Sequence, residues 1–209
     1  MTRPRSAVLC VLLLAGSAGL QSAAWQTVQG DPEREEYAVY AAVISQLYVG
    51  PATKIIVISP PTMTNDQPFR FLFKQFSSLS PTTIRDFDAK NNAPHALKPL
   101  FQLTVPAVLL SEEARRDVFQ HRAESPAGAD KADWQRFYER YPTAPGILSF
   151  SRVGFNPQGT QALVLVGRSW GAACVGPRNP CWVSQYVLLT KQQGTWTVAQ
   201  RESTPHLFF

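Results

Sequence analysis

The side chains best suited to acid–base or metal chemistry in this chain are three histidines, His95, His121 and His206, which lie far apart in the sequence. A catalytic base or a zinc site needs several such groups brought together in space, and separation along the chain neither grants nor excludes this. No GxSxG elbow, HExxH helix or phosphate-binding glycine loop is present. The sequence therefore specifies no reaction, and we expect neither a metal nor a cofactor.

A second group of side chains suits binding rather than reaction, and it lies in one predicted loop between two strands. Tryptophan and arginine are enriched at the energetic centres of interfaces, and loops on a rigid sheet often carry binding residues. The loop combines cations and aromatic rings within residues 168–182. We predict that its ligand-binding residues are Arg168, Trp170, Arg178 and Trp182.

The same loop carries Cys174 and Cys181, with six residues between them. The third cysteine, Cys10, lies in a predicted leader, so its removal leaves an even pair. In an oxidising compartment such a pair is predicted to form a disulfide. A metal site or a redox pair is the alternative, but the spacing is longer than that of typical zinc ligand pairs.

The N-terminus predicts an export signal over residues 1–24. Two arginines precede an apolar run at residues 7–20, which is too short to span a bilayer as a helix of about 20 residues but has the length of a signal-peptide core. Ser22-Ala23-Ala24 supplies the small residues of a cleavage site before Trp25. We expect a periplasmic or secreted protein with no transmembrane segment after cleavage; a retained anchor is the alternative.

The remaining residues, 25–209, are predicted to form a single globular domain. The full chain has 20 basic and 15 acidic residues, and loss of Arg3 and Arg5 leaves a formal charge of +3. The basic residues are dispersed and usually stand beside acids, so the charge pattern does not favour nucleic acid. We expect a protein or small-molecule partner in the cell envelope instead.

Helical periodicity dominates the chain before residue 146. The clearest helix begins at Asp31-Pro32, a capping acid followed by a proline at the first helical position, and its apolar stripe runs to Tyr48. A buried strand is predicted at residues 54–59, and an edge strand interrupted by Pro106 at residues 101–110. Further helices are predicted at residues 69–79, 81–90, 112–121 and 131–140.

The last third of the chain predicts an antiparallel meander, because short turns separate successive strands. The central strands are apolar at both odd and even positions, which indicates cover on both faces, whereas the last strand alternates and suits an edge. Helices folded onto this sheet give an α+β fold, with N-terminal helices packed on a C-terminal antiparallel β-meander. The strands are predicted at residues 147–155, 160–166, 183–190 and 196–199.

Arg152 and Asn156 admit two interpretations. Both could belong to a site at the first turn of the meander. The structural alternative, which we favour, is that Arg152 lays its stem along the apolar face of a strand and Asn156 initiates the turn.

Four segments resemble a group of uncharacterised secreted bacterial proteins: EYAVYAAVISQLY at 36–48, WQRFYERYP at 134–142, SRVGFN at 151–156 and YVLLTKQQGTWTV at 186–198. The resemblance covers the first helix and most of the C-terminal third. It implies export but no activity, so no catalytic residue is carried over. The cysteine-bearing segment at 174–181 is longer than the glycine-rich loop that the resemblance implies there.

Two functions are consistent with these patterns. The first is a non-catalytic exported domain that binds a partner or a small ligand through the 168–182 end of the meander. The alternative is an envelope hydrolase that uses one of the histidines with a serine or a carboxylate in a cleft.

Overall fold

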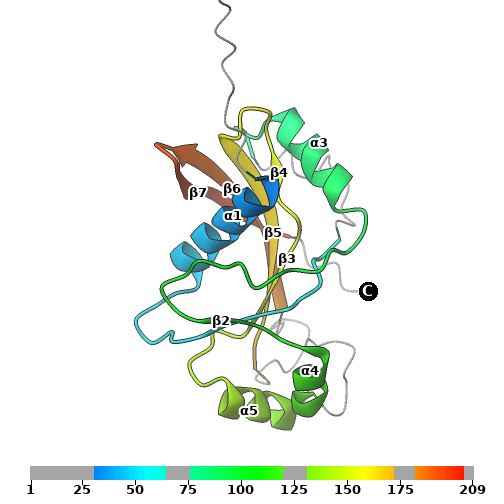
Figure 1. Ribbon diagram of the computed structural model, residues 1–209, viewed down its shortest axis with the longest axis vertical. Coiled ribbons are helices and arrows are strands. Elements are labelled where there is room, and N and C mark those ends of the chain that lie inside the picture. Colours follow the sequence, from blue (N-terminus) through cyan, green and yellow to red (C-terminus); the bar gives the residue numbers. More distant parts are fainter. Residues whose placement is uncertain (1–30, 65–75, 120–130, 172–181, 205–209) are drawn as a thin grey trace, which may run out of the picture.

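The sheet runs the length of the molecule, with helices against both of its faces (Figure 1). The computed structural model describes residues 31–64, 76–119, 131–171 and 182–204. Within these residues the strand order is β2-β1-β3-β5-β6-β7, with β4 beside β5. The predicted α+β fold is confirmed. The elements are α1 (Pro32–Leu47), β1 (Ile56–Ile58), α3 (Pro81–Lys90), β2 (Ala107–Leu109), α4 (Glu112–Val118), α5 (Lys131–Arg140), β3 (Ile147–Phe150), β4 (Gly154–Phe155), β5 (Gln161–Ser169), β6 (Trp182–Gln192) and β7 (Thr195–Ser203).

Helix α1 covers one face of the sheet. It begins as predicted, because Oδ1 of Asp31 accepts a hydrogen bond of 3.0 Å from the Glu33 amide and Pro32 occupies the first turn. Its inward side chains are fully buried against β3, β5 and β6. The side chains from α1 are Val39, Tyr40, Val43 and Ile44, and those from the sheet include Leu148, Phe150, Val164 and Val187.

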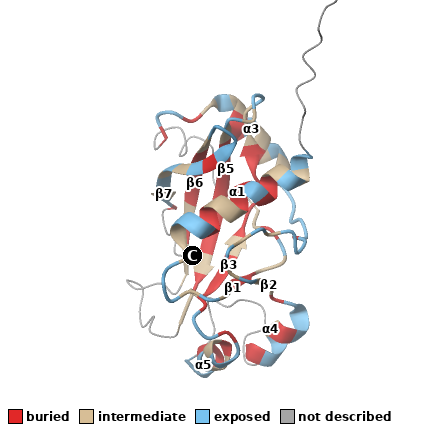
Figure 2. Cartoon of the chain, turned by 60° about the vertical axis from the view of Figure 1, so that its left-hand side comes forward, coloured by how far each residue is buried: buried red, intermediate tan, exposed pale blue. Residues whose placement is uncertain are grey.

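Helix α3 and the pair α4 and α5 cover two parts of the opposite face, so the centre of the sheet is buried on both sides (Figure 2). Helix α3 places Ile84 and Phe87 against Leu163, Tyr186 and Leu188 of β5 and β6. Helices α4 and α5 form a separate cluster over β1 and the start of β3. The predicted double cover of the central strands is confirmed, and six successive residues of β5 are buried.

The strand predicted at residues 147–155 is interrupted. Both of its parts, β3 and β4, pair antiparallel with β5, but Ser151 breaks the ladder between them. The Ser151 hydroxyl accepts a hydrogen bond of 2.8 Å from the Leu165 amide and donates one of 3.0 Å to the Arg152 carbonyl. The Ser151 amide still donates to the Leu165 carbonyl at 2.9 Å, but the hydroxyl takes the place of the Ser151 carbonyl as acceptor, which the apolar pattern of the segment does not reveal.

The sheet is mixed rather than wholly antiparallel. Strand β1, buried as predicted, lies between β2 and β3 and runs parallel to both. Strands β5, β6 and β7 form the predicted antiparallel meander. Strand β2 begins directly after Pro106 and lies at one edge, and β7 alternates exposed and less exposed residues at the other, so both edge predictions are confirmed.

Helix α4 is shorter than predicted, because it ends at Val118 rather than continuing to residue 121. The backbone of Phe119 leaves the helical conformation, and its buried ring lies 5.4 Å from that of Trp134 on α5. The end of α4 thus coincides with the contact between Phe119 and α5. Most of the helix predicted at residues 69–79 lies outside the described residues, as do the predicted leader and both cysteines of the 168–182 loop.

The exposed edge of β7 is partly closed by a side chain of α1. The Gln46 amide donates a hydrogen bond of 3.1 Å to the Trp196 carbonyl and accepts one of 3.0 Å from the Val198 amide. These are the backbone groups that a further strand would use, and open edges promote association between chains.

Gln46→Ala is therefore expected to destabilise the domain by about 1 kcal/mol, because it removes two partly exposed hydrogen bonds. It should also increase self-association at high concentration, measured by analytical ultracentrifugation alongside urea unfolding. Gln135→Ala, an exposed glutamine on α5, is the control. Equal sedimentation of all three proteins at every concentration would contradict the edge-protecting role of Gln46.

Candidate functional site

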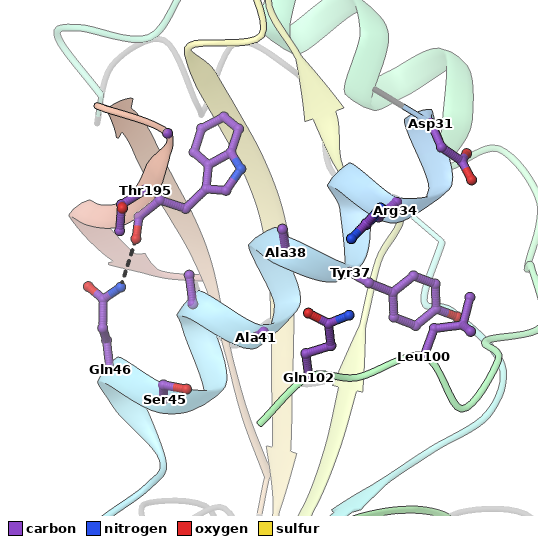
Figure 3. Close-up of a pocket in the computed structure, with 13 residues that line it drawn as sticks. Asp31, Arg34, Tyr37, Ala38, Ala41, Ser45, Gln46, Leu100, Gln102 and Thr195 are labelled. Atoms are coloured by element: carbon purple, nitrogen blue, oxygen red, sulfur yellow. Dashed lines mark hydrogen bonds between the residues drawn. The ribbon is translucent and has the colours of Figure 1, made fainter. Parts of the chain in front are cut away.

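A groove of about 640 Å³ runs along the outer side of α1 (Figure 3). The large apolar side chains of the helix face the sheet, and four of its outer positions between residues 38 and 45 carry small side chains that form a shallow floor. One rim comes from Tyr37 and the segment around Leu100, and the other from the β6–β7 hairpin. The floor consists of Ala38, Ala41, Ala42 and Ser45, and the hairpin rim of Gly194, Thr195 and Trp196.

Each rim is held in place by contacts with α1. The ring of Phe101 lies 5.0 Å from that of Tyr37, which fixes the segment that carries Leu100. On the other side, the Trp196 indole donates a hydrogen bond of 2.6 Å to Oε1 of Glu35, which also pairs with Lys191. The walls of the groove are therefore tied to its floor by contacts within the protein.

The N-terminal end of the groove carries two charged side chains, Asp31 and Arg34. The Asp31 carboxylate caps α1, and Figure 3 shows it turned away from Arg34. The Arg34 side chain lies over the helix toward Ala38 and makes no ion pair with any described residue. Leu100, at the rim, is 48% exposed and is the one large hydrophobic side chain in the described ranges that is so open.

A buried ion pair lies on the inward side of the same helix. Oε1 of Glu36 is 2.7 Å from Nη2 of Arg152, and the Tyr40 hydroxyl donates to the Ser151 carbonyl at 3.0 Å. Asn91 holds the backbone of Arg152, accepting from its amide at 2.7 Å and donating to its carbonyl at 3.0 Å. The hydrogen bond that the Arg152 guanidinium donates to the Glu36 carboxylate raises the pKa of the guanidinium above its usual range.

This geometry supports a structural role for Arg152. It does not support the prediction that Arg152 is a strand residue whose stem lies along the apolar face of the strand. Arg152 belongs to no strand; it lies between β3 and β4 and joins them to α1. Asn156 initiates its turn as predicted, since its Oδ1 accepts from the amides of Thr160 and Gln161 at 2.8 and 2.9 Å.

Burial raises the pKa of the Tyr40 hydroxyl well above its ordinary value of 10.0, and the nearby Glu36 carboxylate adds to this effect. The protonated Tyr40 therefore contributes fully to the stability of the fold below pH 10. This contribution is lost as the pH rises toward the folded-state pKa, because Tyr40 of the unfolded chain releases its phenolic proton at a lower pH. A tyrosine with a raised pKa lowers the free energy of unfolding by up to about 1.4 kcal/mol for each pH unit in this range. Tyr40→Phe should make the decline above pH 10 shallower in urea unfolding, and an unchanged slope would contradict this.

The predicted binding residues of the 168–182 loop are only partly brought together. The Arg168 guanidinium lies over the Trp170 ring, 4.2 Å from its centroid. Trp182, however, is the cross-strand partner of Ser169, and successive strand residues point to opposite faces of the sheet. Trp182 therefore lies on the face away from Arg168. Arg178 lies outside the described residues.

His95 lies at a second cavity, of about 340 Å³, that Glu33 and Glu36 also line. The histidine is exposed, its backbone amide donates to the Thr62 hydroxyl at 2.8 Å, and its imidazole makes no hydrogen bond or ion pair within the described ranges. His121 and His206 lie outside them. In the part of the chain that the structure describes, no three His, Cys, Asp or Glu side chains are placed to hold a metal, and no helix is long and apolar enough to cross a bilayer.

No protein-family model, curated protein or solved structure matches this chain. Sequence reasoning missed the groove over α1, although one signal was present: the outward positions of this helix carry alanine and serine where longer polar side chains are usual.

Proposed function

We propose that this chain is a non-catalytic exported domain that binds a small, mainly apolar ligand in the groove over α1. The observation that carries the proposal is the groove itself. Its volume of about 640 Å³ falls within the range of roughly 300 to 1,000 Å³ typical of small-molecule sites. Such sites combine an apolar lining with a few polar groups that orient the ligand. Export rests on the predicted leader at residues 1–24.

The lining favours binding over catalysis. It contains the hydroxyls of Ser45 and Thr195, but neither a histidine nor a cysteine is among the described residues that form it. Its one carboxylate, Asp31, is engaged at the helix N-terminus. A hydroxyl without a neighbouring base is a poor nucleophile. The groove thus has the groups that orient a ligand and lacks those that activate one.

The end of the meander is the competing location for a site. Arg168 stacked on Trp170 presents a cation and an aromatic ring there, as the sequence predicts. Trp182 lies on the face of the sheet away from Arg168, whose guanidinium stacks on Trp170, so the three side chains do not line one surface together. For this reason the groove is the stronger location.

Ala41→Trp tests the groove, because an indole at the centre of the floor would occupy the space of a ligand. Decanoate and decanol, added as monomers, are expected to shift backbone amide resonances of α1 and of residues 100–102 in the native protein. Ala41→Trp should reduce their affinity at least tenfold. Ala89→Trp, at an exposed position on α3, is the matched control and should bind as the native protein does.

The same titration separates the two locations. Trp170→Ala is expected to leave binding unchanged. If Trp170→Ala abolished binding and Ala41→Trp did not, the site would lie at the end of the meander instead. If neither probe bound the native protein, the proposed function would be wrong.

A further inference from the structure

We propose that the ligand of the α1 groove is a free monoanionic amphiphile with a linear apolar body, whose anionic head is held by Arg34. This inference rests on the proposed function and adds the chemical class of the ligand. It follows from three features of the groove: its charge, its shape and its size.

The charge of the groove is placed at one end. Arg34 is the one cation of its lining in the described ranges, and its side chain lies over the floor (Figure 3). The neighbouring acids are engaged elsewhere: Asp31 caps α1, and Glu35 binds Lys191 and Trp196. Arg34 is thus left to interact with a ligand. A guanidinium presents a planar set of donors that matches a carboxylate.

The shape of the groove is a trough parallel to the helix. Its floor of small residues extends from Ala38 to Ser45, and Arg34 lies one turn before it. With a rise of about 1.5 Å per residue, the distance from Arg34 to Ser45 along the helix is about 16 Å. Leu100 and Trp196 border this trough on its two sides. A linear apolar chain laid along α1 would contact the alanines and both rims while its head reached Arg34.

The size of the groove argues against a folded partner. A stable protein interface buries about 800 Å² on each side. Leu100, on the rim of the groove, is the single strongly exposed large hydrophobic residue in the part of the chain described, so no wider apolar surface of large side chains continues from the groove. A narrow trough whose charged side chains, Arg34 and Asp31, lie at one end fits a small amphiphile better than a protein surface.

The test compares two probes that share an apolar chain and differ in charge, decanoate and decanol, both below their aggregation concentrations. Calorimetry or resonance shifts should give decanoate an affinity about fivefold higher, the size expected of an exposed ion pair near 1 kcal/mol. Arg34→Gln should remove this difference by weakening decanoate alone, and Arg34→Lys should retain most of it. Arg85→Gln, an exposed arginine on α3, is the control and should change nothing.

The outcomes distinguish this inference from the proposed function. Suppose that decanoate and decanol bound the native protein with equal affinity and that Ala41→Trp abolished the binding of both. This result would overturn the proposal that the ligand is anionic, but the groove would still be a binding site. An undiminished preference for decanoate in Arg34→Gln would likewise overturn the role of Arg34. Failure of both probes to bind would overturn both proposals. Recruitment to vesicles of an anionic phospholipid, without binding of monomeric decanoate, would show that the source of the anionic group is a membrane surface and would also overturn the inference.

Discussion

Glu36→Ala is expected to lower the free energy of unfolding by about 3 kcal/mol, because it leaves the Arg152 guanidinium without its carboxylate in a mostly buried setting. The Glu36 side chain is 6% exposed and that of Arg152 is 30% exposed. Removing one partner of a buried pair costs roughly 3 to 5 kcal/mol, and the partial exposure of Arg152 places this case at the lower end. The substitution also removes the acceptor that faces the Tyr40 hydroxyl.

Urea unfolding followed by tryptophan fluorescence measures this loss. Glu33→Ala is the matched control, since Glu33 lies on the same helix but pairs with Lys98 at the surface, where an ion pair contributes at most about 1 kcal/mol. Replacing both partners, as in Glu36→Leu with Arg152→Met, should recover much of the stability, because no buried charge is then left unpaired. A loss below 1 kcal/mol in Glu36→Ala would show that the pair does not hold α1 to the sheet.

Gly154→Ala is expected to cost about 3 kcal/mol or to prevent folding, because α3 lies directly against the backbone of β4. A Cβ at residue 154 would stand 2.4 Å from Cβ of Phe87 and 2.5 Å from its Cα and its nitrogen. Two of these atoms belong to the helix backbone and the Cβ is bonded directly to it, so none of them can move aside without shifting α3. The helix is also held here by Asp86, which accepts a hydrogen bond of 2.7 Å from the Phe155 amide.

Gly50→Ala is the control for Gly154→Ala. A Cβ at Gly50 would meet only the Thr53 hydroxyl, at 3.9 Å, so its stability should stay within about 1 kcal/mol of the native value. Thermal and urea unfolding of the two variants check the difference. Similar stabilities for Gly50→Ala and Gly154→Ala would mean that α3 does not pack on β4 as closely as the structure shows.

The segments that the sequence predicted well are those in which a local pattern decides the conformation. The start of α1 depends on Asp31 and Pro32, which act within one turn of the helix. The turn at Asn156 depends on a side chain that bonds amides four and five residues later. The edge position of β2 follows from Pro106, which has no amide to donate to another strand.

The candidate site was harder to predict, because its parts come from distant segments. The Arg168 and Trp170 stack could be anticipated from their spacing, but the separation of Trp182 from them depends on strand register. The groove needs α1, the segment around Leu100 and the hairpin at Thr195 to lie side by side. Periodicity shows which residues of α1 face outward, but it does not show what stands on either side of them.

By itself, the sequence determined α1, α3, α5 and the start of α4 with their apolar faces, the antiparallel order of β5, β6 and β7, and the two edges of the sheet. The tertiary structure alone decided the parallel placement of β1, the interruption at Ser151, the pairing of Glu36 with Arg152, and the groove. The physical reason is the range of the interactions. Backbone propensity, capping and short turns act over a few residues, whereas Glu36 and Arg152 are 116 residues apart and meet only after α1 has packed on the sheet.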